Sequence, residues 1–444
     1  MPQRSATSTA RKYSRTVFRL LEQHHKWFQQ SLPLVASENV PSPAVREAII
    51  SDFGNRYAEG WPGERVYAGC VYIDQVELLA VELAKKLFKA DFADVRPVSG
   101  LVANLVVYTA FAQANDVMLT KAIVKGGHVS MGPARVKGTA GNVSRLDVQY
   151  FPFDDDNVQI DVDKSKEKIA SLVKEGKPPK IAMFGGSLIL FREPVRELSD
   201  ALKEAGAVVC FDAAHVGGLI AGRQFQDPFE EGATVMTMSS HKCLPGPQGG
   251  IIVSKAEHAD RIKEITFPST VSNHHLHHVA GKAVAMAETL AFGRAYASQI
   301  VRNSKALAQA LYEKGLAVVG ERRGFTESHQ VAVDVSKYGL GGDIEKKLEK
   351  ANIIVNRQML FQDVQKGLHY QNPSGIRLGS QELTRLGMRE KEMKHVADFL
   401  TRVIVKGDSL ERVRREVREF RRDFQKVRYA FESSREAYEY IRIR

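Results

Sequence analysis

One lysine of the chain has a sequence setting in which its amine could act as a nucleophile. Lys242 lies in MTMSSHKCLPGPQGG, residues 236–250, after an apolar run and small hydroxyl residues and before a turn rich in glycine and proline. An amine held there can form a Schiff base with an aldehyde cofactor, provided that its surroundings keep it neutral part of the time. Taken alone, a lysine is more often a solvated surface side chain, so the neighbouring motifs have to decide.

An acid and a histidine follow a nearby apolar run. Asp212 and His215 stand in FDAAHVGGLIAG, residues 211–222, where a strand of an α/β sheet would end and gather ligand groups. Pyridoxal phosphate is an electron sink only while its ring nitrogen is protonated, and a buried carboxylate beside that nitrogen keeps it so. Asp212 is our candidate for this acid. The alternative is an aspartate that caps the following helix.

A possible phosphate site precedes both motifs. Ser99 and Gly100, in RPVSGLVANLVVY, open an apolar run with helical character, and the free N–H groups of a first helical turn attract an anion. An ordinary helix cap explains the same residues. The motif gains meaning only beside Lys242 and Asp212.

Four short apolar runs in the middle of the chain have the length of buried strands: 179–184, 207–211, 234–238 and 250–254. Between the first two lies VRELSDALKEAG, with helical apolar spacing and a terminal glycine, so we predict strand, helix, strand in a parallel sheet. The last two runs are separated by too few residues for a helical crossover. The run 250–254 is therefore predicted to be antiparallel to its partner.

The length of 444 residues favours more than one domain. From about residue 290, helical runs such as IVRNSKALAQALYEKG alternate with the short strands VAVDVS and NIIV, which predicts a separate α+β unit. The expected segments are an N-terminal arm over 1–41, a large α/β domain over 42–288, a small α+β domain over 289–407 and a basic amphipathic helix over 408–444.

The net charge of +11 is concentrated at the two ends of the chain. Residues 1–30 carry six Lys/Arg against one acid, and residues 408–444 carry eleven against eight. This mixture in the tail disfavours a nucleic-acid contact and favours a helix that docks or oligomerises. Its apolar residues follow the helical period: Leu410, Val413, Val417, Phe420, Phe424, Val427 and Phe431.

Other bulk features suggest a cytoplasmic protein. The N-terminus has no apolar signal core, and no run of apolar residues approaches the roughly 18 needed to cross a membrane. The cysteines Cys70, Cys210 and Cys243 have no spacing suited to zinc or to a disulfide framework, so we expect reduced thiols and no metal site.

Motifs along residues 30–405 together resemble the serine hydroxymethyltransferase family, in its archaeal-type branch. The resemblance implies the fold-type I, aminotransferase-like architecture of pyridoxal-phosphate enzymes and active sites shared between subunits, hence a homodimer or homotetramer. The motifs are VASEN (35–39), NRYAEGWPGERVYAGC (55–70), SGLVAN (99–104), GGHVS (126–130), DAAHVGGLIAG (212–222), SSHK (239–242), SNHHLHHVA (272–280) and NPSGIRLGSQE (372–382).

The resemblance also implies roles for single residues. Lys242 matches the Schiff-base lysine, Asp212 the partner of the ring nitrogen and His215 the histidine near the phenolic oxygen of the cofactor. Further cofactor contacts are implied for Ser99, Gly100, Ser187, His241 and, from the neighbouring subunit, Tyr57.

On the substrate side, Arg377 matches the arginine that clamps the substrate carboxylate, a role suited to a planar two-pronged donor. Ser37 lies in the motif that lines the substrate. Glu59 matches the carboxyl group that transfers a proton at the β-hydroxyl, and Tyr67 the tyrosine beside that hydroxyl.

Three positions depart from the family pattern. Met131 stands where we expect the histidine that stacks on the cofactor ring, although His128 remains, and a thioether cannot share a proton as imidazole does. Val66 replaces the first of two adjacent tyrosines, in a region that helps to enclose the folate. Leu101 stands where many members have a small or hydroxyl residue.

Three functions are therefore carried forward. The first is reversible transfer of a hydroxymethyl group between serine and glycine, with tetrahydrofolate or another reduced pterin as carrier. The second, motivated by Met131 and Val66, is a pterin-independent aldolase or transaldolase acting on β-hydroxy-α-amino acids. The third, motivated by the basic ends, is an inactive scaffold or nucleic-acid-binding protein, which the site residues disfavour.

Overall fold

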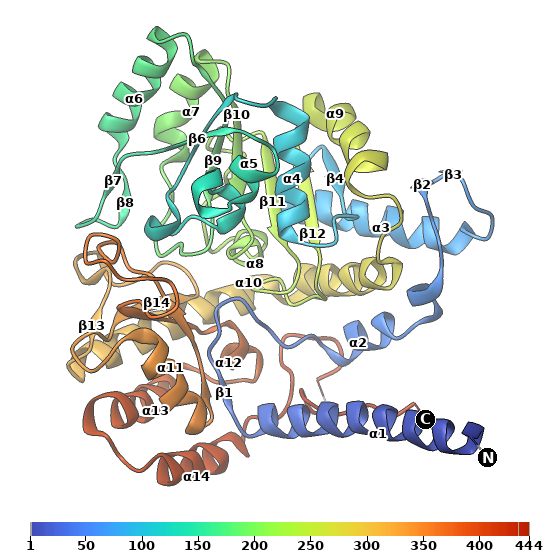
Figure 1. Ribbon diagram of the computed structural model, residues 1–444, viewed down its shortest axis with the longest axis vertical. Coiled ribbons are helices and arrows are strands. Elements are labelled where there is room, and N and C mark those ends of the chain that lie inside the picture. The colour runs from blue at the N-terminus through green and yellow to red at the C-terminus, as the bar shows by residue number, and fades with distance from the viewer. Residues whose placement is uncertain (1, 434, 444) are drawn as a thin grey trace.

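The large domain is built on a seven-stranded sheet with the order β4-β12-β11-β10-β9-β5-β6. The computed structural model, which describes residues 2–433 and 435–443, is shown in Figure 1. The strands are β4 (Phe92–Asp94), β5 (Val117–Thr120), β6 (Asp147–Tyr150), β9 (Pro179–Gly185), β10 (Val208–Asp212), β11 (Val235–Ser239) and β12 (Gly250–Ser254). Neighbours are parallel except at β12, which is antiparallel to both β11 and β4. The four predicted strands and the direction of the last are confirmed.

Helices cover both faces of this sheet because its strands are apolar on both sides. In β10, Phe211 belongs to one core and the adjacent Cys210 to the other, as the alternation of a strand requires. The first core packs against α3 (Val71–Phe88), α6 (Val162–Lys174), α7 (Val195–Glu204), α8 (Gly217–Ala221) and α10 (Leu276–Glu313). The second packs against α4 (Gly100–Phe111), α5 (Thr139–Asn142) and α9 (Ala259–Glu264). The helix predicted between the first two strands is α7.

The C-terminal part forms a second, antiparallel sheet of four strands in the order β13-β14-β17-β16. These strands are β13 (Ala317–Val318), β14 (Gln330–Asp334), β16 (Asn356–Gln358) and β17 (Gly375–Gly379), and the helices with them are α11 (Gly341–Lys350), α12 (Gln381–Arg385) and α13 (Glu390–Thr401). This is the expected α+β unit. The predicted strand NIIV contributes β15 (Ile353–Ile354), which pairs instead with β1 (Leu32–Pro33) from the N-terminal segment.

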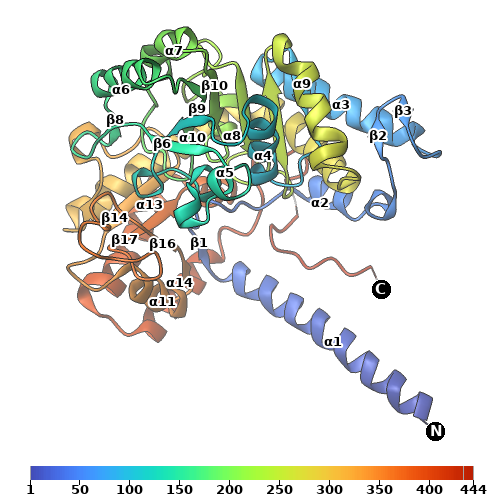
Figure 2. The same cartoon turned by 45° about the horizontal axis from the view of Figure 1, so that its top comes forward.

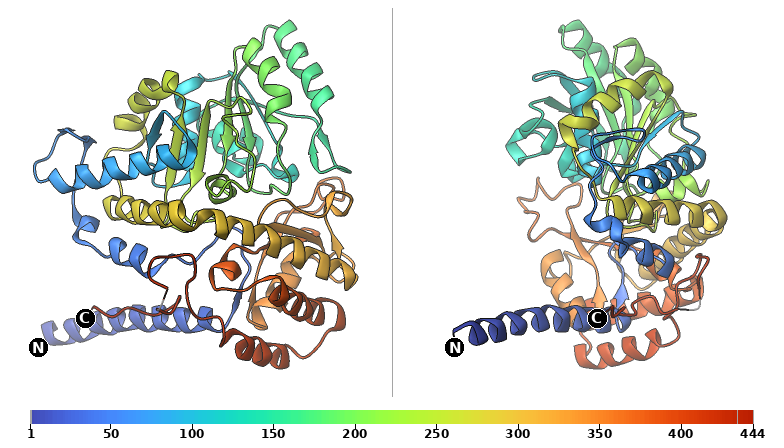
Figure 3. Two further views of the ribbon diagram at one scale, coloured as in Figure 1. Left: turned by 180° about the vertical axis from the view of Figure 1, so that it is seen from behind. Right: turned by 90° about the vertical axis from the view of Figure 1, so that its right-hand side faces the viewer.

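One helix joins the two sheets. Helix α10 is 38 residues long and runs between the large and small domains (Figure 3). The boundary predicted between residues 288 and 289 falls inside it, because the helical period continues without a break across that point. The two domains therefore share a helix rather than a linker.

The N-terminal helix α1 (Pro2–Gln29) projects from the body of the molecule, as Figure 2 shows. Beyond it the chain is anchored by β1 and continues into α2 (Pro43–Ile49) and the hairpin of β2 (Gly60–Trp61) and β3 (Glu64–Arg65). A second small hairpin joins β7 (Phe153–Asp154) and β8 (Gln159–Ile160). No helix within the described residues is both long enough and apolar enough to cross a membrane.

The predicted C-terminal helix over 408–444 is wrong in its extent. Helix α14 runs only from Leu410 to Arg421, and the chain then turns back toward α1. The side chain of Arg421 is buried and donates to the carbonyl oxygens of Ser31, at 2.5 Å, and of Phe424, which fixes the turn. Residues 1, 434 and 444 of the predicted terminal segments lie outside the described residues.

Candidate active site

Lys242 lies in the loop between β11 and β12, at the edge where the parallel strands end. Only 8% of its surface is exposed. Burial lowers the pKa of its amine to about 8, with Asp212 opposing the shift and Arg377 adding to it. Asn39 donates to the Lys242 carbonyl oxygen at 2.6 Å and ties the VASEN motif to this loop. The adjacent His241 has a buried Nδ1 atom without a partner among the described residues.

Asp212 is the last residue of β10 and is also buried. Its carboxylate accepts the N–H of Ala214 at 2.9 Å and the side-chain amide of Asn104 at 2.9 Å. Thr237 donates to the oxygen of that amide at 2.6 Å, which fixes its orientation. Helix α8 begins only at Gly217, so Asp212 is not its cap. Two donors hold this buried carboxylate in place. Its negative charge can keep a neighbouring ring nitrogen protonated.

Ser99 and Gly100 begin α4 as predicted. The Ser99 side chain accepts the N–H of Val102 at 3.2 Å, so it is a helix cap. Gly100 is pressed against β11, where a Cβ atom would lie 2.6 Å from the Ser239 hydroxyl oxygen. Because a first helical turn has N–H groups without intrahelical acceptors, this end of α4 can also hold an anion. The cap and the anion site are compatible.

Met131, which we expected against the cofactor ring, lies in the interior of the large domain. Its side chain is fully buried in the second core of the large domain, and the Thr120 hydroxyl contacts its sulfur at 3.4 Å. Its contact with the cofactor ring therefore stays a prediction.

His128, three residues before Met131, lies among the charged residues of the site. Its Nδ1 atom accepts the N–H of Ser130 at 3.1 Å, and Asp212, Lys242 and Arg377 all act on its pKa, which burial chiefly lowers. A sequence signal did exist in the two preceding glycines. Gly126 has φ of +101°, and a Cβ on Gly127 would lie 2.1 Å from a backbone oxygen.

Arg377, on β17 of the small domain, is a buried cation. It donates from Nη1 to the Ser187 carbonyl oxygen at 2.7 Å and from Nε to the Asn356 side-chain oxygen at 3.3 Å. No carboxylate of the described chain pairs with it, and burial lowers its pKa to about 10, so it stays charged at neutral pH. An unpaired buried guanidinium favours a carboxylate ligand. It borders an open hollow of about 590 Å³, also lined by His128, Ser187, Arg357, Met359 and Tyr370.

His215 is buried between the two domains. Gln330 contacts its Nδ1 atom at 2.9 Å, and its ring stacks on His329 with centroids 5.5 Å apart. Burial, reinforced by Lys242, lowers its pKa well below the usual value, so the imidazole is neutral. Ser37, half-buried, follows the residue whose carbonyl oxygen His329 contacts.

Three predicted residues lie elsewhere. Tyr57 and Tyr67 are 47% and 46% exposed, with ring centroids 4.7 Å apart, and Glu59 accepts a hydrogen bond from Ser272 at 3.0 Å. They surround the β2–β3 hairpin, which Figure 1 shows at the outer edge of the large domain. None of the three lines the hollow beside Arg377. Val66, at 69%, is also exposed there.

An arginine that the sequence did not single out holds this hairpin. Arg65 donates from Nη1 to the carbonyl oxygens of Ala58, at 2.8 Å, and of Gly60, the two residues that flank Glu59. Its Nη2 atom pairs with the buried Glu77 at 2.7 Å, and Glu77 also pairs with Arg96 at 2.8 Å. The backbone on both sides of Glu59 is thus tied to a buried charge network.

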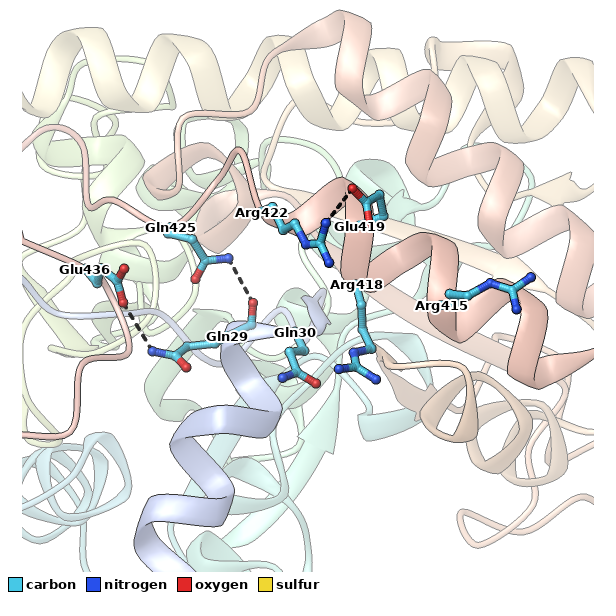
Figure 4. Close-up of a pocket in the computed structure, with 8 residues that line it drawn as sticks. All are labelled: Gln29, Gln30, Arg415, Arg418, Glu419, Arg422, Gln425 and Glu436. Atoms are coloured by element: carbon cyan, nitrogen blue, oxygen red, sulfur yellow. Dashed lines mark hydrogen bonds and ion pairs between the residues drawn. The ribbon is translucent and has the colours of Figure 1, made fainter.

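A second hollow, of about 550 Å³, lies between α14 and the end of α1 (Figure 4). Its charges are mixed: Arg422 pairs with Glu419 at 2.7 Å, while Arg415 and Arg418 also line it. It contains neither a lysine nor a buried acid. This hollow does not belong to the chemistry around Lys242. In the described chain, no group of three or more His, Cys, Asp or Glu side chains is arranged to hold a metal ion.

The parallel sheet with a buried lysine and aspartate at its strand ends defines a fold-type I, pyridoxal-phosphate-dependent enzyme. A solved structure supports this class: L-threonine transaldolase from Pseudomonas fluorescens, with a TM-score of 0.84, 28% identity and 96% of each chain covered. The family model described as serine hydroxymethyltransferase matches residues 11–400. The chain belongs to the serine hydroxymethyltransferase family.

Relatives named serine hydroxymethyltransferase extend along the whole chain. The protein of Cenarchaeum symbiosum is 56% identical, covering 99% of this chain and 100% of its own length. That of Nitrosopumilus maritimus is 55% identical, with 96% and 97% covered. That of Pyrococcus horikoshii is 48% identical, with 96% and 98% covered. The similarity to an archaeal-type branch is confirmed.

Proposed function

We propose that the enzyme cleaves the Cα–Cβ bond of serine reversibly, gives glycine and transfers the one-carbon unit to a reduced pterin such as tetrahydrofolate. The observation that carries this proposal is the buried Arg377, which has no carboxylate partner among the described residues and lies near enough to Lys242 to act on its pKa, as Asp212 also does. Arg377 would bind an amino-acid carboxylate. Lys242 and Asp212 suit an aldehyde cofactor with a basic ring nitrogen.

The residues present fit pyridoxal phosphate. Lys242 would hold its aldehyde carbon, Asp212 its ring nitrogen and the first turn of α4 with Ser99 its phosphate. The Nδ1 atom of His241, which has no partner among the described residues, would supply a further polar contact. When bound, the cofactor supplies the electron sink for negative charge at Cα. Lys242 returns to a neutral amine readily because its pKa is already about 8.

Arg377 would orient the amino acid by its carboxylate, with Ser37 and Ser187 along the same side. The Ser187 carbonyl oxygen already takes one N–H of Arg377, at 2.7 Å, and so limits the rotation of the guanidinium. The remaining donors are free for a two-pronged contact with the substrate. Specificity for α-amino acids would follow from this contact.

We assign Tyr57, Glu59 and Tyr67 to the active site of a second subunit. Their exposure and their distance from the hollow support this assignment, because within one chain they have no reacting group to serve. Glu59 would transfer the proton at the β-hydroxyl, with Tyr67 beside it. The protein would therefore be at least a homodimer.

The proposal is tested by spectra and by product analysis. The purified protein should be yellow with pyridoxal phosphate, and the colour should be lost in Lys242→Ala. Conversion of serine to glycine should require a reduced pterin. A colourless wild-type protein would contradict the cofactor, and equal rates with and without tetrahydrofolate would contradict the pterin.

The second candidate is a pterin-independent aldolase or transaldolase. Exposed Val66 favours it, since a valine offers neither a ring nor a hydroxyl to enclose a pterin. Met131, the other residue that motivates this alternative, is buried in the second core of the large domain. Cleavage of threonine at the rate of serine, without a pterin, would decide for the alternative.

We place the enzyme in the cytoplasm, within one-carbon metabolism of amino acids. The three cysteines are buried and unpaired among the described residues, which suits a reducing compartment. Burial raises the pKa of the Cys243 thiol well above its usual value, so this neighbour of Lys242 stays protonated and unreactive.

A further inference from the structure

Gln330 on β14 is fully buried, and its amide has only one possible orientation. Its oxygen accepts the N–H of Ile189 at 2.7 Å, and its nitrogen donates to the Ser187 carbonyl oxygen at 2.7 Å. Exchanging the two amide atoms would place N–H against N–H and oxygen against oxygen. The group that meets His215 Nδ1 at 2.9 Å is therefore an N–H donor.

His329, the other polar neighbour of this Nδ1 atom, offers it no acceptor. Its Nε2 contacts the Ala36 carbonyl oxygen at 3.1 Å, which can only accept, so Nε2 carries the proton. This Nε2 also lies 3.4 Å from His215 Nδ1. Burial lowers the pKa of His329 to about 3, so its ring is neutral and offers no second proton.

Nδ1 of His215 thus meets one N–H donor, from Gln330, and no acceptor on His329. A proton on Nδ1 would oppose the Gln330 donor and would itself lack an acceptor there, in a buried place where unmet donors are costly. The positive groups around the ring, Lys242 and Arg377, oppose a cation as well. The neutral ring therefore carries its single proton on Nε2.

We propose that Gln330 is a positioning residue that fixes His215 as the Nε2–H tautomer and thereby makes it a hydrogen-bond donor to the ring oxygen of the cofactor. The identity of that acceptor rests on the proposed function. The tautomer itself rests only on the hydrogen bonds of this chain. A donor at the ring oxygen stabilises its anionic form and so lowers its pKa.

The tautomer is tested directly by ¹⁵N NMR of histidine-labelled full-length protein, with and without pyridoxal phosphate. The expected result is a protonated Nε2 and an unprotonated Nδ1 for His215 in both states. A protonated Nδ1 in the wild type would overturn the proposal. A protein that shows the expected tautomer but binds no cofactor would instead contradict the proposed function alone.

The functional consequence is tested with Gln330→Met, which keeps the volume but removes the donor. The visible absorption of the bound cofactor should change with pH at a midpoint about one pH unit higher than in the wild type, since a hydrogen bond to an anionic oxygen is lost. Thr326→Val is the matched control: it removes a buried hydrogen bond to Leu190, at 3.3 Å, on the loop before β14. The midpoint of Thr326→Val should not move.

An unchanged midpoint in Gln330→Met, or equal shifts in both variants, would overturn the proposal. If Gln330→Met does not fold, the NMR result on the wild type decides.

Discussion

At the scale of single residues, the site depends on one amine whose charge is set by its surroundings. Burial lowers the pKa of Lys242 to about 8, Asp212 raises it again and Arg377 lowers it further. Burial therefore has the largest effect on the pKa of this amine, and the charges of Asp212 and Arg377 shift it in opposite directions. The amine is partly neutral near physiological pH, which an exposed lysine is not.

This arrangement predicts a pH dependence for cofactor binding. Only the neutral amine attacks the aldehyde, so the rate of colour formation in cofactor-free enzyme should rise roughly tenfold per pH unit and level off above about pH 8. Asp212→Asn removes a charge that raises the pKa and should move this bend to lower pH. Arg377→Gln should move it to higher pH. Stopped-flow absorbance across the pH range checks all three, and shifts in the same direction for both variants would contradict the assignment.

The residues of the site differ in how far the sequence could reveal them. Lys242, Asp212, Ser99 and Arg377 stand in local motifs at element ends, and the structure brings them to one edge of the sheet or to the facing small domain. Gln330 acts through partners far away in the chain. Gln330 and Ile189, for example, are 141 residues apart. Such contacts depend on tertiary packing, which one sequence does not show.

At the scale of elements, too, local sequence reveals some features and tertiary packing decides others. The strands β9 to β12 are short apolar runs bounded by turn residues, so the sequence predicts them directly. The end of α14 is different, because the apolar period continues through Phe424 and Val427 while the chain turns at Arg421. Val427 packs with Val40 in a separate cluster instead. The spacing of the apolar residues alone does not distinguish one long helix from a short helix followed by a segment that packs elsewhere.

Arg421 is therefore predicted to stabilise the end of the chain. Arg421→Met leaves the carbonyl oxygens of Ser31 and Phe424 without their donor and should lower the free energy of unfolding by about 2–4 kcal/mol. Arg422→Met is the control, because Arg422 is exposed and its ion pair is with the exposed Glu419. Urea denaturation of both variants measures the difference. Equal stability of the two would show that the buried arginine does not hold the turn.

The β2–β3 hairpin makes a second prediction at this scale. Arg65→Met frees the backbone on both sides of Glu59, and a displacement of about 1 Å can reduce turnover about a hundredfold. The colour of the bound cofactor should be unchanged, since Lys242 lies outside the hairpin. Arg56→Met, which removes an exposed pair with Asp52, is the control and should keep its kcat. Loss of cofactor colour in Arg65→Met would contradict a role confined to the hairpin.

At the scale of the whole molecule, the proposed site is divided between two places in one chain. The hollow beside Arg377 lies between the domains, whereas Tyr57, Glu59 and Tyr67 flank the strands of the β2–β3 hairpin. In the dimer that we propose, twofold symmetry would place the hairpin of each subunit at the hollow of the other. The partner subunit would then cover the exposed rings of Tyr57 and Tyr67.

This arrangement predicts complementation between inactive variants. Lys242→Ala and Glu59→Gln, co-expressed in equal amounts, should form mixed dimers in half of the cases, each with one intact site, and so recover about a quarter of wild-type activity. The control pair is Lys242→Ala with Arg377→Ala. Both residues belong to the same half of the site, so every site in that mixture lacks one of them and no activity should return. Recovery in neither pair, or equal recovery in both, would place Glu59 outside a shared site.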